Sequence, residues 1–429
     1  MRLSTRGGRF VVPVGLVLGL LTACGSGSGG EGGAPAPQGS GRSTTAAAKG
    51  YNPPLKFQDQ PAHDIAGGVD EGNWSVELRE TTAYAVSDEE VRAVSVLDGE
   101  ELWSVRPRGQ LAEDTDYGTD AIAGPHFVAI DGRIALLAAF SVTEPGSGTT
   151  PDRPLIELTA VAADSGKRLW TATVERPEGH EEGEPYLAGA DATTAVLTFG
   201  GETDAVSVGI SLATRETTWT EQGFDARFVD TGVVVGRGGA DSALGGGATV
   251  EGRKTADGSK AWTYRDRLNK TELSPVGGGL FTAVVDAPFE SETRIADLLA
   301  ISTGKPPAGL RTGRALGEPD DLSCWWAEGS AVVCETEKDF DERVVALDPE
   351  NWGELWFISS DDKTRLMPDV STVFRSAVYG ETENGSVVLD ARTGKDRASG
   401  DGDAPFAVDE YAGLFGTSLG TIESRRAVS

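Results

Sequence analysis

Short runs of alternating apolar and polar residues recur along the chain from about residue 55 to its end. Each run is typical of a half-buried β-strand, whose successive side chains point to opposite faces of a sheet. Many runs are followed by Asp-Gly, Asp-Ser-Gly or Thr-Gly, turn sequences in which Gly adopts a positive φ. No apolar period of about 3.6 residues occurs, so the pattern predicts an all-β protein.

The strands belong to a repeating unit, which consists of an apolar run, a turn and often Leu-Trp. The unit recurs with a period of about 42–49 residues, which is typical of β-propeller blades. The interval between Trp103 and Trp170 is longer, and we interpret Ser141–Pro154 within it as an insertion. The seven copies are Ala93–Trp103, Leu158–Trp170, Val206–Trp219, Ala248–Trp262, Ile295–Gly309, Arg343–Trp356 and Gly385–Ser399; the fifth and the seventh lack the Trp.

The repeat predicts one domain over residues 53–429, a single β-propeller of four-stranded blades. Residues 401–429 supply strand-like sequence after the seventh copy, and either Pro54–Ile65 or the segment around Trp74 could add the missing edge strand to it. That closure would hide both sheet edges, so we favour eight blades, with seven as the alternative. The repeated Trp side chains are expected to pack between blades, at a cost of about 3–5 kcal/mol for each Trp→Ala.

The repeat resembles the Trp-docking repeat of quinoprotein-type (PQQ-like) β-propellers. Asp98-Gly99 with Trp103, Asp164-Ser165-Gly166 with Trp170, and Asp390 with Thr393-Gly394 carry the resemblance. That family includes quinoprotein alcohol dehydrogenases, outer-membrane assembly lipoproteins of the BamB type and sensor domains of bacterial surface kinases. The resemblance implies a propeller but does not choose among these functions.

The first 52 residues are expected to direct and tether the protein. Arg2, Arg6 and Arg9 precede the apolar stretch Phe10–Leu21, which is too short to cross a bilayer and is typical of a signal peptide. Leu21-Thr22-Ala23-Cys24 then resembles the bacterial lipobox, which implies cleavage after residue 23 and a lipid on the Cys24 sulfur. Residues 24–52 would be the lipidated Cys followed by a flexible Gly/Ser/Pro-rich tether. A secretory signal that ends in Cys by chance is the alternative.

Cys324 and Cys334 are the candidate disulfide. They flank Glu328-Gly329-Ser330, and a hairpin turning there places the two Cys on opposite strands. Such a pair should oxidise outside the cytoplasm, and we expect it to stabilise the fold by about 2–3 kcal/mol. Two reduced, buried thiols are the alternative.

Candidate chemistry is sparse. Asp114, Asp116 and Asp120 resemble the start of a calcium loop, but Pro125 replaces the Glu that should complete it, so the alternatives are a weak Ca²⁺ site and a solvated loop. The adjacent Cys pair that quinoprotein dehydrogenases set against their quinone is missing. We therefore expect no cofactor, and PQQ least of all. The three His are far apart, and we find no catalytic constellation.

The net charge of the chain limits the kinds of partner that it can bind. The chain has 38 Lys and Arg against 67 Asp and Glu, a net charge of −29, which excludes nucleic-acid binding through a basic face and favours basic partners. We predict a monomeric, non-catalytic scaffold that binds a protein or a ligand, lipid-anchored on the extracytoplasmic face of a bacterial membrane. A quinone- and Ca²⁺-dependent oxidoreductase, or a surface sensor acting with a membrane partner, is the alternative.

Overall fold

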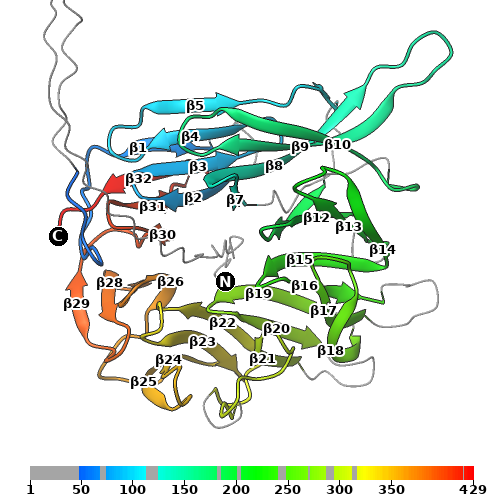
Figure 1. The fold of residues 1–429 in the computed structure, drawn as a ribbon. Coiled ribbons are helices and arrows are strands. Elements are labelled where there is room, and N and C mark those ends of the chain that lie inside the picture. Colours follow the sequence, from blue (N-terminus) through cyan, green and yellow to red (C-terminus); the bar gives the residue numbers. More distant parts are fainter. Residues whose placement is uncertain are drawn as a thin grey trace, which may run out of the picture.

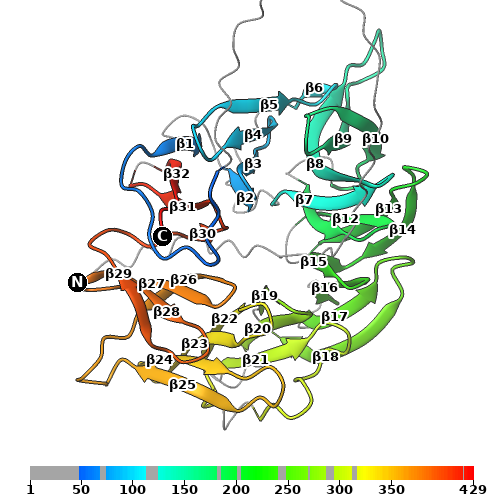
Figure 2. The ribbon, with the colours of Figure 1, turned by 60° about the vertical axis from the view of Figure 1, so that its left-hand side comes forward.

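The computed structural model describes residues 48–67, 74–112, 124–180, 185–200, 204–239, 248–268, 271–286, 294–311, 316–418 and 420–429. These residues form eight antiparallel sheets, which follow one another in sequence order around a ring (Figures 1 and 2). We number the sheets as blades 1 to 8. The prediction of an eight-bladed, all-β propeller is confirmed.

Blades 1 to 4 contain strands β2 to β18. Blade 1 is β2 (Ser75–Arg79), β3 (Thr82–Val86), β4 (Val91–Ser95) and β5 (Glu101–Val105). Blade 2 is β6 (Gln110–Leu111), β7 (His126–Ile130), β8 (Arg133–Glu144), β9 (Arg153–Ala162) and β10 (Arg168–Glu175). Blade 3 is β11 (Tyr186–Ala190), β12 (Thr194–Phe199), β13 (Val206–Ser211) and β14 (Thr217–Gln222). Blade 4 is β15 (Phe224–Asp230), β16 (Val233–Gly238), β17 (Ala248–Lys254) and β18 (Lys260–Leu268).

Blades 5 to 8 contain the remaining strands. Blade 5 is β19 (Thr271–Gly277), β20 (Leu280–Asp286) and β21 (Arg294–Ala300). Blade 6 is β22 (Asp321–Trp326), β23 (Val332–Lys338), β24 (Asp341–Leu347) and β25 (Glu354–Ser359). Blade 7 is β26 (Asp369–Phe374), β27 (Ala377–Thr382), β28 (Gly385–Asp390) and β29 (Asp396–Ser399). Blade 8 is β30 (Ala407–Val408), β31 (Ala412–Gly416), β32 (Ile422–Arg426) and β1 (His63–Ala66).

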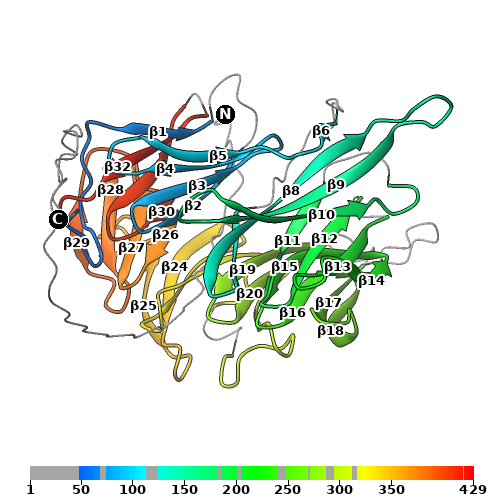
Figure 3. The ribbon, with the colours of Figure 1, turned by 45° about the horizontal axis from the view of Figure 1, so that its top comes forward.

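Two blades depart from four strands. Blade 5 has three in its described residues, and the segment after β21 makes only an isolated bridge between Ala300 and Lys305. Blade 2 has five, because both β6 and β7 pair with the long β8. The segment interpreted as an insertion, Ser141–Pro154, which we expected to be a loop, is strand at its ends, since residues 141–144 and 153–154 extend β8 and β9. Their hairpin projects from the ring (Figure 3).

The two ends of the chain close the ring. Strand β1 pairs with β32, with His63 opposite Ser424, so the first strand completes the last blade. The red C-terminal strands accordingly lie beside the blue β1 (Figure 2). Of the two segments that could supply this strand, Pro54–Ile65 does so through its last residues, because β1 spans His63–Ala66.

The core lies between blades. Eight clusters of buried apolar residues occur among the described residues, each shared by two neighbouring blades. In β3, Ala83 and Ala85 pack toward blade 8, whereas Tyr84 and Val86 pack toward blade 2. Middle strands therefore have two apolar faces, and all six residues of β12 are buried.

The Trp side chains of outer strands pack against a turn of the next blade, as the repeat predicts. The Nε1–H of Trp219 donates to the Thr255 carbonyl at 2.8 Å, and its ring lies where a Cβ on Gly258 would be. The remaining joints of this kind are Trp103 with Ala163 and Gly166, Trp262 with Ile301 and Gly304, and Trp356 with Ala391 and Gly394. Each Gly has a positive φ, and removing its side chain makes room for the indole.

Trp170 is buried between blades 2 and 3 in the same way, whereas two other joints use substitutes. Blade 5 lacks a docking Trp, and Trp352 of blade 6 takes the glycine position instead, with φ +60° and its N–H donated to the Asp348 carbonyl. Its side chain packs with Leu310, so here the indole comes from the opposite side of the joint. Between blades 8 and 1, His63 lies against Gly99 where a Trp would stand.

Candidate functional site

The ring has two distinct faces. Because the strands of each blade alternate in direction, the turns from first to second strand and from third to fourth strand share one face, which we call the turn face. The turns from second to third strand and the connections between blades share the other, which we call the loop face. The projecting β8–β9 hairpin and the β23–β24 hairpin both belong to the loop face.

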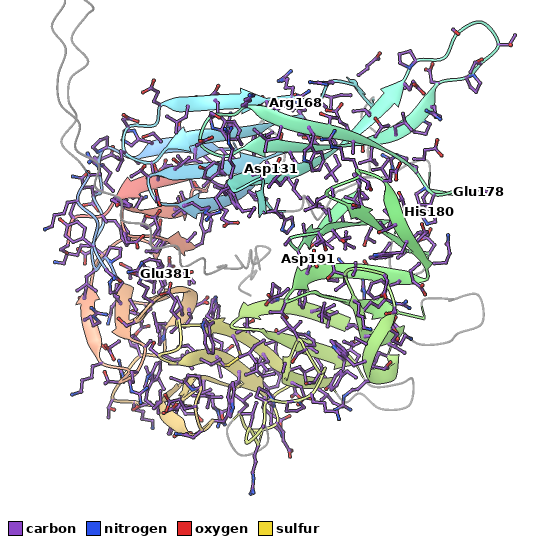
Figure 4. The ribbon with its side chains drawn as sticks, in the orientation of Figure 1. Asp131, Arg168, Glu178, His180, Asp191 and Glu381 are labelled. Atoms are coloured by element: carbon purple, nitrogen blue, oxygen red, sulfur yellow. A yellow bond between two sulfur atoms is a disulfide. The ribbon has the colours of Figure 1, made fainter. Side chains whose placement is uncertain are left out.

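The turns between first and second strands bring carboxylates together around the turn face. Six of the eight such turns carry an acidic residue, and the seventh, in blade 7, carries Arg375. Asp131 and Asp191 lie on the inner side of the ring (Figure 4). The acidic residues of these turns are Glu80, Asp131, Asp191, Asp230, Glu328, Asp409 and Glu410.

Blade 8 holds the most perturbed of these carboxyl groups. Burial is the main cause that raises the pKa of Asp409 to about 7; the nearby charges of Glu410 and Glu80 act in the same direction, and the hydrogen bonds from the Tyr411 and Ala412 backbone oppose them. Its Oδ1 accepts the backbone N–H groups of Tyr411 at 2.7 Å and Ala412 at 2.9 Å, whereas its Oδ2 is buried without a hydrogen-bond partner. The side chain thus caps the turn, and its ionisation is costly there.

Arg375 links three blades on the same face. Its guanidinium pairs with Glu410 of blade 8 and lies 3.7 Å from a carboxylate oxygen of Glu328 in blade 6. The other carboxylates of the first-to-second-strand turns exceed this positive charge, so these turns together present negative charge to a partner.

Two titratable groups on inner strands are perturbed by burial. Burial raises the pKa of Glu77 to about 8, which Arg79 partly opposes. Burial lowers the pKa of His126 to about 4, although its Nε2 lies 2.8 Å from the Leu187 carbonyl of the next blade. Glu77 lies on β2 and His126 on β7, so the two groups belong to different blades.

The predicted site residues have different outcomes. Cys324 and Cys334 form a disulfide between facing positions of β22 and β23, buried in the core between blades 5 and 6. Cys24 and the weak Ca²⁺ candidates Asp114, Asp116 and Asp120 lie outside the described residues. Within the described ranges, no group of three or more His, Cys, Asp or Glu side chains could hold a metal ion.

The three His do not meet. His63 is at the joint between blades 8 and 1, and His126 is between blades 2 and 3. His180 lies with Glu178 at the periphery of the ring (Figure 4), where its Nε2 is 2.5 Å from the Asp204 carbonyl. The described residues contain no helix long and apolar enough to span a membrane.

Sequence reasoning missed two features, Asp409 and Phe340. Asp409 follows the last repeat copy, in a blade that the chain assembles from both of its ends, so its burial had no local signal. Phe340 stands between two alternating runs in Lys338-Asp339-Phe340-Asp341, and an aromatic residue at a two-residue turn was a signal that could have been used.

Comparisons with known proteins agree with the repeat. Residues 67–264 match the family model described as outer membrane protein assembly factor BamB, which confirms the resemblance over that part of the chain. No curated protein matches significantly.

The solved structures that are similar to this chain include the following three. BamB from Moraxella catarrhalis has a TM-score of 0.42 at 12% identity over 85% of this chain and 100% of that chain. The computationally designed Ika8 protein has a TM-score of 0.46 at 14% identity over 88% and 99%. The WD40 domain of SCAP from fission yeast has a TM-score of 0.40 at 10% identity over 87% and 98%.

Proposed function

We propose that this chain, a PQQ-like β-propeller with a BamB-type repeat, is a non-catalytic protein-binding scaffold anchored by a lipid on Cys24 to the extracytoplasmic face of a bacterial membrane. Propellers present two loop-built faces on a rigid ring, so the same architecture serves many binding roles and the site must be argued from this chain's own surface.

One observation carries the proposal, namely the hydrogen bonds that place residues 51–55 against the ring. The Tyr51 N–H donates to the Glu410 carbonyl at 2.7 Å, and the Leu55 N–H donates to the carbonyl of the C-terminal Ser429. Both ends therefore lie on the turn face, beside its carboxylates. A lipid on Cys24 would attach the ring to the membrane from the side of this face, and the Gly/Ser/Pro-rich composition of the roughly 26 intervening residues predicts about 25–30 Å of reach.

This orientation suits a scaffold. The acidic turn face would remain off an anionic membrane surface by repulsion, while basic segments of membrane proteins could approach it. The loop face would point outward and carry the projecting β8–β9 hairpin. The family model that matches is described as an outer membrane protein assembly factor, which supports the expectation that this chain binds protein partners.

The anchor is tested with Cys24→Ser in cells given an alkyne-labelled fatty acid. The natural protein should carry the label and sediment with membranes, whereas Cys24→Ser should lose both properties. Cys334→Ser is the control, because that thiol is buried in the disulfide and its variant should keep the label. Label retained by Cys24→Ser would overturn the anchor.

The scaffold is tested by lysine-reactive cross-linking in intact cells, followed by mass spectrometry. Reproducible cross-links from this chain to another protein support it, and cross-links within the chain alone contradict it. The non-catalytic part is tested separately by adding PQQ and Ca²⁺ to the purified protein. We expect no quinone absorbance and no shift in the unfolding midpoint; either would favour the oxidoreductase.

A further inference from the structure

The turn of the β23–β24 hairpin contains an unusual residue. Lys338 pairs with Asp341, so Asp339 and Phe340 form the two-residue turn, with φ of +49° and +70°. Positive φ at both positions is the type I′ arrangement, which favours Asn-Gly or Asp-Gly. Phe340 thus stands where Gly is preferred, and a bulky side chain there strains the backbone.

Packing does not explain this strain. The Phe340 side chain is 93% exposed, the most of any large apolar side chain in the described ranges, and the next is Phe357 at 57%. Trp352 shows the contrast, because it also has a positive φ but packs its ring with Leu310 in the joint between blades 5 and 6. A residue that is both strained and solvated points to a role in binding rather than in folding.

The surroundings of Phe340 are acidic. Asp339 and Glu342 are exposed, and Asp361 follows in the adjoining connection, where Ser360 and Glu342 exchange hydrogen bonds at 2.8 and 3.3 Å. The nearby cations are already matched. Arg343 pairs with Asp341 at 2.7 Å, and Lys338 lies 3.6 Å from Glu318. The carboxylates around Phe340 are therefore in excess.

We propose that Phe340 is an anchor that inserts into an apolar pocket of a protein partner, and that Lys or Arg side chains edge that pocket. Exposed aromatic residues that become fully desolvated are the usual dominant contacts of protein interfaces. A second copy of this chain would bring like charges together, and an anionic lipid surface would be repelled by the same carboxylates. The loop face also points away from the tether.

This inference deepens the scaffold proposal and rests on it, but the two can fail separately. The first measurement uses the purified protein alone. Phe340→Gly creates the preferred Asp-Gly turn, so its thermal unfolding midpoint should equal or exceed that of the natural protein. A lower midpoint would show that Phe340 stabilises the fold, and the inference would be wrong.

The second measurement places the photo-cross-linker p-benzoylphenylalanine at position 340 in cells, with position 357 as the matched control. Phe357 is also an exposed Phe of blade 6, but it lies in a regular strand. We expect a discrete adduct with another protein from position 340 and none from position 357. That protein, once purified, should bind Phe340→Gly about 30-fold more weakly than the natural chain, and Phe357→Ser with unchanged affinity.

Several results would overturn the inference. These are equal binding of Phe340→Gly, an adduct between two copies of this chain, a lipid adduct, or no adduct at all. Binding to phosphatidylglycerol vesicles that is lost in Phe340→Gly would assign the residue to a membrane instead. If lysine cross-linking finds a partner while position 340 does not, only the role of Phe340 fails; if neither does, the scaffold proposal fails too.

Discussion

The indole joints allow one hydrogen bond to be weighed against a matched site. Trp219 and Trp170 are both buried docking residues, but only Trp219 donates its Nε1–H, to the Thr255 carbonyl at 2.8 Å. The Nε1 of Trp170 is buried without a hydrogen-bond partner, and the Arg215 guanidinium lies 5.7 Å from its ring centre. Trp→Phe removes similar apolar area at both sites and removes a hydrogen bond at only one.

The magnitude follows from what each substitution leaves behind. Trp219→Phe leaves the Thr255 carbonyl without its donor, which costs about 1–3 kcal/mol beyond the lost packing. Trp170→Phe removes a donor that was already unsatisfied, so it carries no such cost. We therefore expect Trp219→Phe to lower the free energy of unfolding by about 2 kcal/mol more than Trp170→Phe.

The assay is guanidinium unfolding followed by far-ultraviolet circular dichroism, which does not depend on the substituted fluorophore. The comparison is made through the unfolding midpoints, provided that both variants keep the slope of the natural protein. Equal midpoints for the two variants would refute the assignment of stability to the Trp219 hydrogen bond.

Three further predictions concern the disulfide, a buried carboxyl group and a glycine. Replacing both Cys324 and Cys334 by Ala should lower the free energy of unfolding by about 2–3 kcal/mol, and dithiothreitol should lower the melting temperature of the natural protein but not of that variant. Because burial raises the folded-state pKa of Asp409 to about 7, its contribution to stability is fully present below about pH 4 and is lost as pH rises from about 4 through about 7, by at most about 1.4 kcal/mol per pH unit. Asp409→Asn should flatten that part of a pH–stability profile, and an unchanged profile would contradict the assignment. In chemical unfolding, Gly166→Ala should lower the free energy of unfolding by about 1–3 kcal/mol more than Gly132→Ala. Both glycines have a positive φ, but only at Gly166 would a Cβ meet the Trp103 ring, 2.5 Å away. Equal losses of stability would mean that the ring shifts freely.

The sequence predicted the ring because a large part of its structure is local. The alternating runs, the turn sequences and the Trp positions all lie within single blades, so their spacing along the chain reports the blade period directly. The disulfide was predictable for the same reason, since Cys324 and Cys334 flank one hairpin.

The substitutes were not predictable in this way. The loss of a docking Trp in blade 5 is compensated by Trp352, and the joint between blades 8 and 1 uses His63; neither residue stands where the repeat pattern places its Trp. The acidic turn face is likewise invisible along the chain, because its members come from different blades and meet only when the ring closes. The local sequence pattern predicts the strands and turns of each blade, whereas the charge and burial of residues on the two faces depend on the closed ring.

The pairing of β1 with β32 sets a constraint on how the molecule is made. The strand that pairs with His63–Ala66 contains Ser424, which follows seven intervening blades in the chain, so His63–Ala66 must wait unpaired until those blades have been synthesised. Until then the growing arc has an open sheet edge at each end, which neighbouring chains could recruit. A protein built in this way becomes resistant to aggregation at its final step, when its two ends find each other.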